Sequence, residues 1–311
     1  MLAGVSESAR TPASSALDAK PSRPILGAFS ALLMVLNMLF WVPLLLVVAV
    51  VRLVIPIPAV RRALAPVLSG IAEAWAAGNS AGMALTQNTR WDVSGFEGLK
   101  RDAWYMVCCN HQSWVDIVVL QHLTNRRIPM LKFFLKQELI WVPLMGLAWW
   151  ALEFPFMRRH SEAQMRARPE LRGQDQEATR RACAKFSETP TSVMNFLEGT
   201  RFTPEKRAKH SSPYTHLLRP KAGGLALAMN AMGEKFSAIL DVTIAYPEGI
   251  PTLWDFLQGK VGRIAVRARV LPIPPELLAC DYAGDAEARA AFQSWVATLW
   301  QEKDATLREL L

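Results

Sequence analysis

Two short segments of the chain combine residue types that can do chemistry. In the first, NHQSWVD at residues 110–116, His111 and Asp116 stand five positions apart directly after an apolar segment that predicts a strand. An imidazole held by a carboxylate is the arrangement that a general base needs, because the carboxylate fixes the tautomer and stabilises the imidazolium that forms. On a regular helix the two side chains would point about 140° apart, so they can meet only where the backbone turns. We therefore expect a strand to lead into a helix through a turn at this point.

The same residues allow a purely structural interpretation. Ser113 and Asp116 have the spacing of a capping box ahead of the apolar run that starts at Ile117, in which case the carboxylate only caps a helix. The sequence leaves the two interpretations open. His122, by contrast, is predicted to be an ordinary helix-face residue.

The second segment, FLEGTR at residues 196–201, also ends a predicted strand. Gly199 lets the backbone approach a ligand closely, and the Arg201 guanidinium can grip a phosphate through two parallel hydrogen bonds. An exposed Arg in a strand-end turn is the ordinary alternative. In an open α/β sheet, ligands bind beyond the carboxyl ends of the strands, so we expect both segments to share one mouth. Two basic segments, residues 156–159 and 219–224, are candidates to join them.

A competing chemistry is suggested by GNSAG at residues 78–82, which fits the G-x-S-x-G nucleophile elbow of serine hydrolases. That motif requires a strand before Ser80 and a helix after it. The preceding residues 71–77 read as a helix, so the context argues against this interpretation. A serine esterase using Ser80 stays as the rival enzyme hypothesis.

The elements that must position these residues follow from the patterns around them. Strands are predicted over residues 103–109, 191–197, 237–245 and 263–270, and helices over 59–77, 117–123 and 286–311. With 51% hydrophobic residues and this alternation, the sequence excludes a disordered chain and predicts an α/β fold, with a largely parallel or mixed sheet flanked by helices. We expect the 311 residues to divide into a disordered polar N-terminus (1–24), a hydrophobic membrane anchor with a linking helix (25–80), an α/β domain (81–275) and a C-terminal amphipathic helix (276–311).

The anchor rests on 27 uncharged residues from Ile25 to Val51, which as a straight helix would reach about 40 Å against a hydrocarbon core of about 30 Å. Its length argues against a cleaved signal peptide. Three basic residues precede it and three follow it, so the positive-inside rule gives no orientation. Pro43 lies within it, and a simple span and a bent, re-entrant pair of helices both stay open. A second apolar run, residues 139–152, is too short to span and predicts either a buried helix or a surface for lipid chains.

The positive charge is also concentrated in one segment of the chain. The net charge is +8, and residues 158–221 hold fourteen Lys and Arg against seven Asp and Glu. Such a segment suits a phosphate-bearing partner or an anionic membrane face. No nucleic-acid-binding motif accompanies it, so we expect no nucleic acid partner. The four cysteines have neither paired spacing nor a nearby set of His ligands, which argues against disulfides and against a metal site.

With NHQSWVD at 110–116 and FLEGTR at 196–201, in this order after an apolar anchor, the chain resembles the glycerolipid acyltransferase family, which includes 1-acylglycerol-3-phosphate acyltransferases. The resemblance covers roughly residues 90–250. Residues 131–136, followed by residues 146–149, look most like the branch that also holds lysocardiolipin acyltransferases and bacterial YihG-type proteins. The fold implied is an α/β domain with a helical anchor lying on or in one leaflet.

The resemblance implies roles position by position. The family's HxxxxD motif falls on His111 and Asp116, which implies that His111 takes the proton from an acceptor hydroxyl as it attacks an acyl thioester, with Asp116 orienting the ring. The implied site for the acceptor's phosphate comprises Glu198, Gly199, Thr200, Arg201, Arg158 and Lys221. Residues 152–158 lack the Gly usual in the family's intervening motif, and residues 242–245 lack the Pro usual in its fourth motif.

The activity implied is transfer of a fatty acyl group from acyl-CoA or acyl carrier protein to the free hydroxyl of a lysophospholipid, lysophosphatidic acid above all. A thioester is already activated, so no metal or other cofactor is implied. The expected partners are the lysophospholipid, the acyl donor and a lipid bilayer; in a bacterium this is the inner membrane, with the active site facing the cytoplasm. The non-enzymatic alternative is a membrane-anchored basic module that binds anionic lipid.

Overall fold

A computed structural model of the chain describes residues 16–157, 189–278, 282 and 284–311. In this part of the chain six strands form one sheet, in the order β1-β8-β7-β2-β6-β3. They are β1 (Arg90–Ser94), β2 (Tyr105–Cys109), β3 (Leu131–Phe133), β6 (Ser192–Phe196), β7 (Ala238–Ala245) and β8 (Arg263–Leu271). All neighbouring pairs are parallel except β7 and β8. The predicted α/β fold with a mixed, largely parallel sheet is confirmed.

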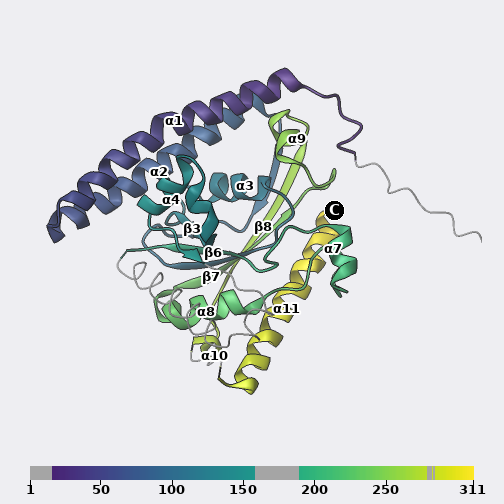
Figure 1. Cartoon of the computed structure of the whole chain (residues 1–311). Helices are drawn as coiled ribbons and strands as arrows, with labels where there is room; N and C mark the ends of the chain where they lie inside the picture. The colour runs from purple at the N-terminus through teal and green to yellow at the C-terminus, as the bar shows by residue number, and fades with distance from the viewer. Residues whose placement is uncertain (1–15, 158–188, 279–281, 283) are drawn as a thin grey trace, which may run out of the picture.

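Helices cover both faces of the sheet (Figure 1). On one face lie α8 (Ala222–Met232), α10 (Pro275–Leu278) and α11 (Ala286–Leu310), and on the other lies α3 (Val115–Thr124). Strand β2 explains why both faces are apolar: its alternate side chains, such as Met106 and Val107, belong to opposite cores, and all five of its residues are buried. The sheet is therefore sandwiched, and its ligand-accessible positions are at the strand ends.

The C-terminal helix α11 is tied to the sheet by a buried charge. Lys303 is fully buried, and its Nζ donates to the Val242 carbonyl at 2.6 Å and lies 2.7 Å from Asp241 Oδ1. Asp241 Oδ2 also pairs with Arg269 at 2.7 Å. A buried ammonium needs such partners because an unpaired charge in the core is strongly destabilising. The network joins α11 to β7 and β8.

Two long helices, α1 (Pro24–Val54) and α2 (Pro58–Thr86), form an antiparallel hairpin along one side of the molecule (Figure 1). In the middle of the hairpin, Asn37 Nδ2 donates to the Trp75 carbonyl and to Asn79 Oδ1, both at 2.8 Å. Gly78 gives Asn37 room, since a Cβ built there would overlap the Asn37 side chain. Polar bonds inside an otherwise apolar interface fix the register of the two helices.

Both ends of α1 are attached to the α/β domain. At its N-terminal end, Gln258 Oε1 accepts from the Ser22 hydroxyl at 2.7 Å and from the Arg23 amide at 2.9 Å. At its C-terminal end, Arg52 Nη1 pairs with Glu153 Oε1 at 3.0 Å. The helix therefore lies along the domain over its whole length.

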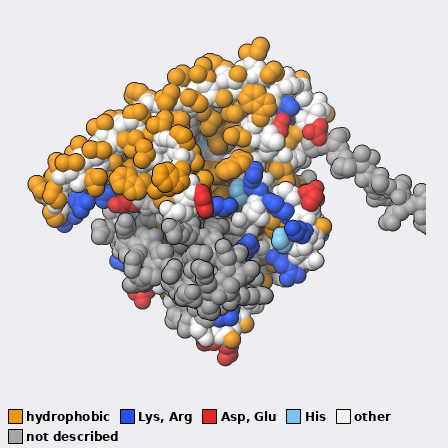
Figure 2. Space-filling view, viewed as in Figure 1, with side chains coloured by type: hydrophobic (Ala, Val, Ile, Leu, Met, Phe, Trp, Pro, Cys, Tyr) orange, Lys and Arg blue, Asp and Glu red, His pale blue; other side chains and the backbone are white. Residues whose placement is uncertain are grey.

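Helix α1 is long and apolar enough to cross a membrane, and within the described residues it is the one helix that meets this test. Its outward side chains form a continuous apolar strip along the top of Figure 2. The exposed members include Ile25, Phe29, Leu32, Leu36, Phe40, Val47 and Val54.

Several elements differ from the expectation. The helix predicted over 59–77 continues to Thr86. Residues 139–152 do not form one buried helix: a 3-10 turn, η1 (Gln137–Trp141), is followed after Pro143 by α4 (Met145–Ala151), and the Trp141 side chain is 85% exposed. Pro143 cannot continue the hydrogen bonding of the preceding turn. Strands β1 and β3 and helix α8 were not predicted, and neither were the short elements β4 (Leu135–Lys136), β5 (Phe156–Met157), α7 (Pro204–Lys209), η2 (Gly233–Lys235) and α9 (Leu253–Leu257).

Candidate active site

The two motif segments meet at one edge of the sheet. Strands β2 and β6 are parallel neighbours, with Cys109 opposite Phe196, so the residues that follow them emerge side by side. The Phe202 amide donates to the His111 carbonyl at 2.7 Å, which ties the second segment to the first. His111 and Arg201 both line one cavity. The expected shared mouth is therefore present in the structure.

His111 is held by Asp116 as the general-base hypothesis requires. His111 Nδ1 lies 2.9 Å from Asp116 Oδ2, and the carboxyl group is fully buried. A carboxylate only accepts hydrogen bonds, so Nδ1 is the donor, and in the neutral form of the imidazole Nε2 is the acceptor. The ring stacks on Phe196 with a centroid separation of 3.9 Å. The imidazole is thereby fixed in one tautomer and one orientation at the cavity wall.

Asp116 also shapes the turn, so the structural alternative is not exclusive. Asp116 Oδ2 accepts from the amides of Gln112 at 2.6 Å and Ser113 at 2.9 Å. The second of these bonds is half of the predicted capping box, while the Ser113 hydroxyl accepts from the Val115 amide instead. One carboxylate both fixes the turn that leads into α3 and orients His111, because the sharp turn brings the ring back over it.

Glu198 does not occupy the place expected of a phosphate contact. Its side chain is buried, and its two carboxyl oxygens accept from the amides of His111 and Leu218, both at 2.8 Å. Burial raises the pKa of Glu198 to about 8, although the two amides act in the opposite direction. A buried carboxyl that bonds the backbone of His111 supports that residue rather than binding an anion.

The rest of the second motif does face the cavity. Gly199 turns with φ +68°, which favours glycine, and Gly199, Thr200 and Arg201 all line the cavity. The Arg201 guanidinium lies 5.0 Å from the centre of the Trp114 ring, a cation–π contact with the first motif. Lys206, which sequence reasoning missed, donates from Nζ to Thr200 Oγ1 at 2.8 Å and to the Arg201 carbonyl at 2.9 Å.

The two remaining predicted phosphate contacts have different outcomes. The Lys221 side chain lies beside the turn at Gly199: a Cβ built on Gly199 would be 3.2 Å from Lys221 Cδ. The Lys221 amide donates to the Leu197 carbonyl at 2.6 Å. Arg158 lies outside the described residues. The roles of both residues stay predictions.

The cavity that these residues line has a volume of about 610 Å³ and mostly apolar walls. It runs from His111 past α3 and α4 to the inner face of the α1–α2 hairpin. Its apolar lining includes Trp41, Leu45, Ile71, Trp75, Ile117, Phe133, Met145 and Trp149, and its basic lining consists of Lys136 and Arg201. A cavity of this size suits an extended ligand with one anionic end.

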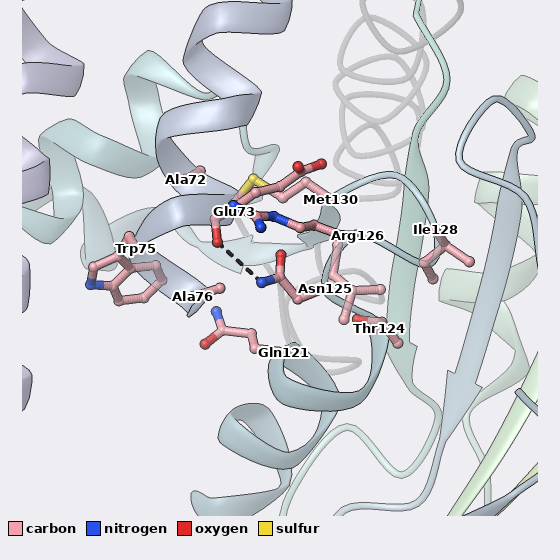
Figure 3. A pocket seen from close by; sticks show the side chains of 11 residues that line it. Ala72, Glu73, Trp75, Ala76, Gln121, Thr124, Asn125, Arg126, Ile128 and Met130 are labelled. Atoms are coloured by element: carbon pink, nitrogen blue, oxygen red, sulfur yellow. Dashed lines mark hydrogen bonds between the residues drawn. The ribbon is translucent and has the colours of Figure 1, made fainter. Parts of the chain in front are cut away.

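Two other clefts among the described residues are much smaller, at about 30 and 20 Å³. A cleft of about 30 Å³ lies between α2 and the residues that follow α3, where Asn125 Nδ2 donates to the Glu73 carbonyl at 3.1 Å (Figure 3). That volume holds about one water molecule. Within the described part of the chain, no group of three His, Cys, Asp or Glu side chains has the arrangement of a metal site.

The structure overturns the nucleophile-elbow hypothesis for Ser80. Ser80 lies inside α2, between a helical turn before it and another after it, rather than between a strand and a helix. Its hydroxyl donates to the Ala76 carbonyl at 3.0 Å and lies 2.9 Å from His122 Nδ1. The hydroxyl thus bonds the backbone of its own helix, and the His122 ring also packs on Trp91.

Two further residues support His111 and were missed by sequence reasoning. The Asn110 side chain bonds both backbone groups of Ile244 at 2.9 Å, which fixes the end of β2 to β7. The Tyr246 hydroxyl donates to Asp116 Oδ1 at 2.6 Å. Both partners lie about 130 residues away in sequence, so no local pattern could have revealed them.

The sequence profile of the family described as "Acyltransferase" matches residues 90–247, which include both motifs. The chain belongs to this acyltransferase family. It is therefore an acyltransferase enzyme, and the cavity with His111 and Asp116 is its candidate active site.

Curated relatives agree with this assignment. The 1-acyl-sn-glycerol-3-phosphate acyltransferase delta of Homo sapiens is 27% identical over 217 residues, which cover 66% of this chain and 52% of the relative. The gamma enzyme of Mus musculus is 28% identical over 213 residues, which cover 64% and 51%. The matched region thus spans about half the length of these relatives.

A solved structure has the same fold. The crystal structure of the 1-acyl-sn-glycerophosphate acyltransferase PlsC from Thermotoga maritima superposes with a TM-score of 0.56 over 93% of this chain and 95% of that one. The sequences are 16% identical, so the comparison supports the fold of this acyltransferase and leaves its substrate to be argued from the site.

Proposed function

We propose that this acyltransferase transfers a fatty acyl group from acyl-CoA or acyl carrier protein to the free hydroxyl of a lysophospholipid, with lysophosphatidic acid as acceptor and phosphatidic acid as product. The observation that carries the proposal is the His111–Asp116 pair on the wall of an apolar cavity of about 610 Å³ that also presents Arg201. The apolar length suits a fatty chain, and a guanidinium suits a phosphate. The similarity to relatives named as acyl-glycerol-phosphate acyltransferases supports the same acceptor class.

The proposed reaction follows from the tautomer of His111. Nε2 accepts the proton of the acceptor hydroxyl while that oxygen attacks the thioester carbonyl carbon. The resulting tetrahedral intermediate collapses, the carbon–sulfur bond breaks, and the imidazolium returns the proton to the thiolate. Asp116 stabilises the imidazolium between the two proton transfers.

The decisive experiment replaces His111 in purified protein supplied with labelled palmitoyl-CoA or palmitoyl-acyl carrier protein and lysophosphatidic acid. We expect His111→Ala to lower the rate by about 10²- to 10⁴-fold, the usual contribution of a general base. His210→Ala, at an exposed His after α7, is the matched control. Activity of His111→Ala within threefold of wild type would falsify the proposal.

Arg201 provides a separate test of the acceptor. We expect Arg201→Ala to raise KM for lysophosphatidic acid by about tenfold or more, because a hydrogen-bonded ion pair to phosphate is lost. Transfer to a neutral monoacylglycerol should change little. Lys209→Ala, an exposed basic residue nearby on α7, serves as the control. Equal losses with the two acceptors would remove Arg201 from the phosphate site.

The same proposal includes a location at a membrane surface. Helix α1 exposes an apolar strip, and it is attached to the α/β domain at both ends through Gln258 and Glu153. Arg52 lies in the last turn of α1, and Arg61 and Arg62 lie near the start of α2, so the tip of the hairpin carries charges whose burial in hydrocarbon would be costly. We infer that the hairpin lies in the plane of the interface, in a bacterium at the cytoplasmic face of the inner membrane.

A further inference from the structure

The buried tyrosine that follows β7 contacts the catalytic pair from behind. Tyr246 is 2% exposed, and its hydroxyl donates to Asp116 Oδ1 at 2.6 Å. The other carboxylate oxygen, Oδ2, receives His111 Nδ1 and the amides of Gln112 and Ser113. The two oxygens of Asp116 therefore have different partners. Oδ2 bonds the imidazole, and Oδ1 bonds the Tyr246 hydroxyl.

The position of Tyr246 is fixed on both sides along the chain. Two residues before it, Ile244 exchanges two hydrogen bonds with the Asn110 side chain at 2.9 Å. Five residues after it, the Pro251 carbonyl accepts from the Ser113 hydroxyl at 2.5 Å. Both contacts lead to the segment that carries His111. Tyr246 therefore contacts Asp116 from the end of β7. The Asn110–Ile244 and Ser113–Pro251 hydrogen bonds fix that end of β7 relative to residues 110–116.

We propose that Tyr246 is a positioning residue for acyl transfer: by holding Asp116 Oδ1 it keeps Oδ2 aimed at His111 Nδ1 through the reaction. The inference rests on the proposed function of His111 as general base. A carboxylate with one unsatisfied buried oxygen would pay a desolvation penalty and could rotate toward another donor. With both oxygens bonded, its orientation does not change when His111 gains or loses a proton.

The hydroxyl of Tyr246 is suited to this task because it stays protonated. Burial and the neighbouring Asp116 carboxylate raise the pKa of Tyr246 well above its ordinary value. It therefore remains a donor at every pH at which an unprotonated His111 can act.

Other ionisable groups lie around the pair, but among the described residues the Tyr246 hydroxyl forms a hydrogen bond to Asp116 alone. Glu198 bonds the His111 amide, and the Cys109 thiol is buried on β2 with a raised pKa. The buried ammonium of Lys303 lies behind the sheet, and Lys136 and Arg201 face the cavity. Differences between the wild type and a phenylalanine variant can therefore be assigned to the hydroxyl.

The test compares Tyr246→Phe with Tyr105→Phe, which removes another buried hydroxyl, one that accepts from the Lys100 amide at 2.9 Å away from the site. We expect Tyr246→Phe to lower kcat about 10- to 100-fold, the effect of one hydrogen bond to a charged group, with both KM values unchanged. The acid limb of its pH–rate profile should move to higher pH, because the less solvated carboxylate binds the imidazolium more tightly. Tyr105→Phe should keep wild-type kcat and pH profile.

A double-mutant cycle separates positioning from a loss of folding. On an Asp116→Asn background, Tyr246→Phe should cause little further loss, because the two residues act as a unit. Thermal unfolding of every variant is measured in parallel. Wild-type kcat in Tyr246→Phe, or losses that multiply with those of Asp116→Asn, would overturn the inference. Retained activity in His111→Ala would instead refute the proposed function, so the two failures are distinguishable.

Discussion

Two buried carboxyl groups, those of Asp116 and Glu198, lie next to His111, and they differ in role because they bond different partners. Asp116 bonds the imidazole, two amides and the Tyr246 hydroxyl. Glu198 bonds two amides only, one of them that of His111 itself. The first group can respond to the charge of the ring, whereas the second holds the backbone from which the ring projects. Sequence motifs that contain both carboxyls therefore combine a chemical role with a structural one.

Glu198 should make the stability of the protein depend on pH. Burial raises its pKa to about 8 from 4.5, so the native state binds this proton more tightly than the unfolded chain does. By linkage, its contribution to the free energy of unfolding decreases as pH rises from about 4.5 to 8 and is constant above that range. We expect urea unfolding at pH 5.5 and 8.5 to show a smaller pH-dependent difference in Glu198→Gln than in the wild type.

The exposed residue Glu97 supplies the control for this measurement, because Glu97→Gln removes a carboxyl without a buried partner. Its pH dependence should match that of the wild type. If Glu198→Gln retained the full wild-type dependence, another group would be responsible, and Glu198 would be ionised in the native state at neutral pH.

For individual residues of the site, the sequence predicts the contacts between residues that are close together in the chain and misses those between distant ones. His111 and Asp116 are five residues apart and could be paired by reasoning about one turn. The site of Arg201 followed from the rule that ligands bind at strand ends. Tyr246 and the carboxyl contacts of Glu198 depend on tertiary pairing of β2 with β6 and β7, which no local pattern encodes. Glu198 was assigned to the phosphate site only because it belongs to the motif. In the structure its side chain is buried and bonds two backbone amides instead.

At the scale of elements, the fully buried central strands were predicted, whereas the charged edge strand β1 was not. Strands β2 and β7 are buried along their length and were found from their apolar runs. Edge strand β1 has the sequence RWDVS, and its Asp92 pairs with Arg263 and Arg267 of β8 at 2.6 and 3.0 Å. A strand stabilised by charges from a distant neighbour has no alternation to detect.

The hairpin offers a test of element packing within a single helix. Gly78 and Gly70 both lie in α2, but a Cβ at Gly78 would overlap Asn37 of α1, whereas a Cβ at Gly70 has no atom within 4 Å. We expect Gly78→Ala to destabilise the protein by about 1–3 kcal/mol through loss of the Asn37 hydrogen bonds. Gly70→Ala should be neutral or stabilise it by up to about 1 kcal/mol, because alanine favours helix. Thermal unfolding in detergent measures both.

Limited proteolysis at the connection between α1 and α2 gives a second readout of the same pair. Cleavage near residues 55–57 should be faster in Gly78→Ala than in Gly70→Ala, since a loosened hairpin opens more often. Equal stability and equal cleavage of the two variants would mean that Asn37 does not set the packing of the hairpin.

At the scale of the whole molecule, the cavity and the apolar strip belong to one arrangement. The cavity reaches the inner face of the hairpin, and the strip covers its outer face. A fatty chain that enters from a membrane along this side meets apolar walls until it reaches His111. Burying a 16-carbon chain is worth on the order of 12 kcal/mol, at about 0.8 per methylene, so passage through water would be strongly unfavourable. Placing the hairpin in the interface avoids that step.

This arrangement predicts that the hairpin tip and the α/β domain lie on the same side of the bilayer. Cysteines introduced by Ile57→Cys, at the exposed connection, and Glu97→Cys, in the domain, should both react with a membrane-impermeant maleimide added outside vesicles that carry the domain outward. The background variant has Cys183 and Cys280 replaced by serine, while Cys108 and Cys109 are buried and should not react.

A cysteine introduced by Leu36→Cys, on the apolar strip, should be protected until detergent is added. Protection of the Ile57→Cys variant with reaction of the Glu97→Cys variant would instead require α1 to cross the membrane, and its attachment through Arg52 and Glu153 would have to break.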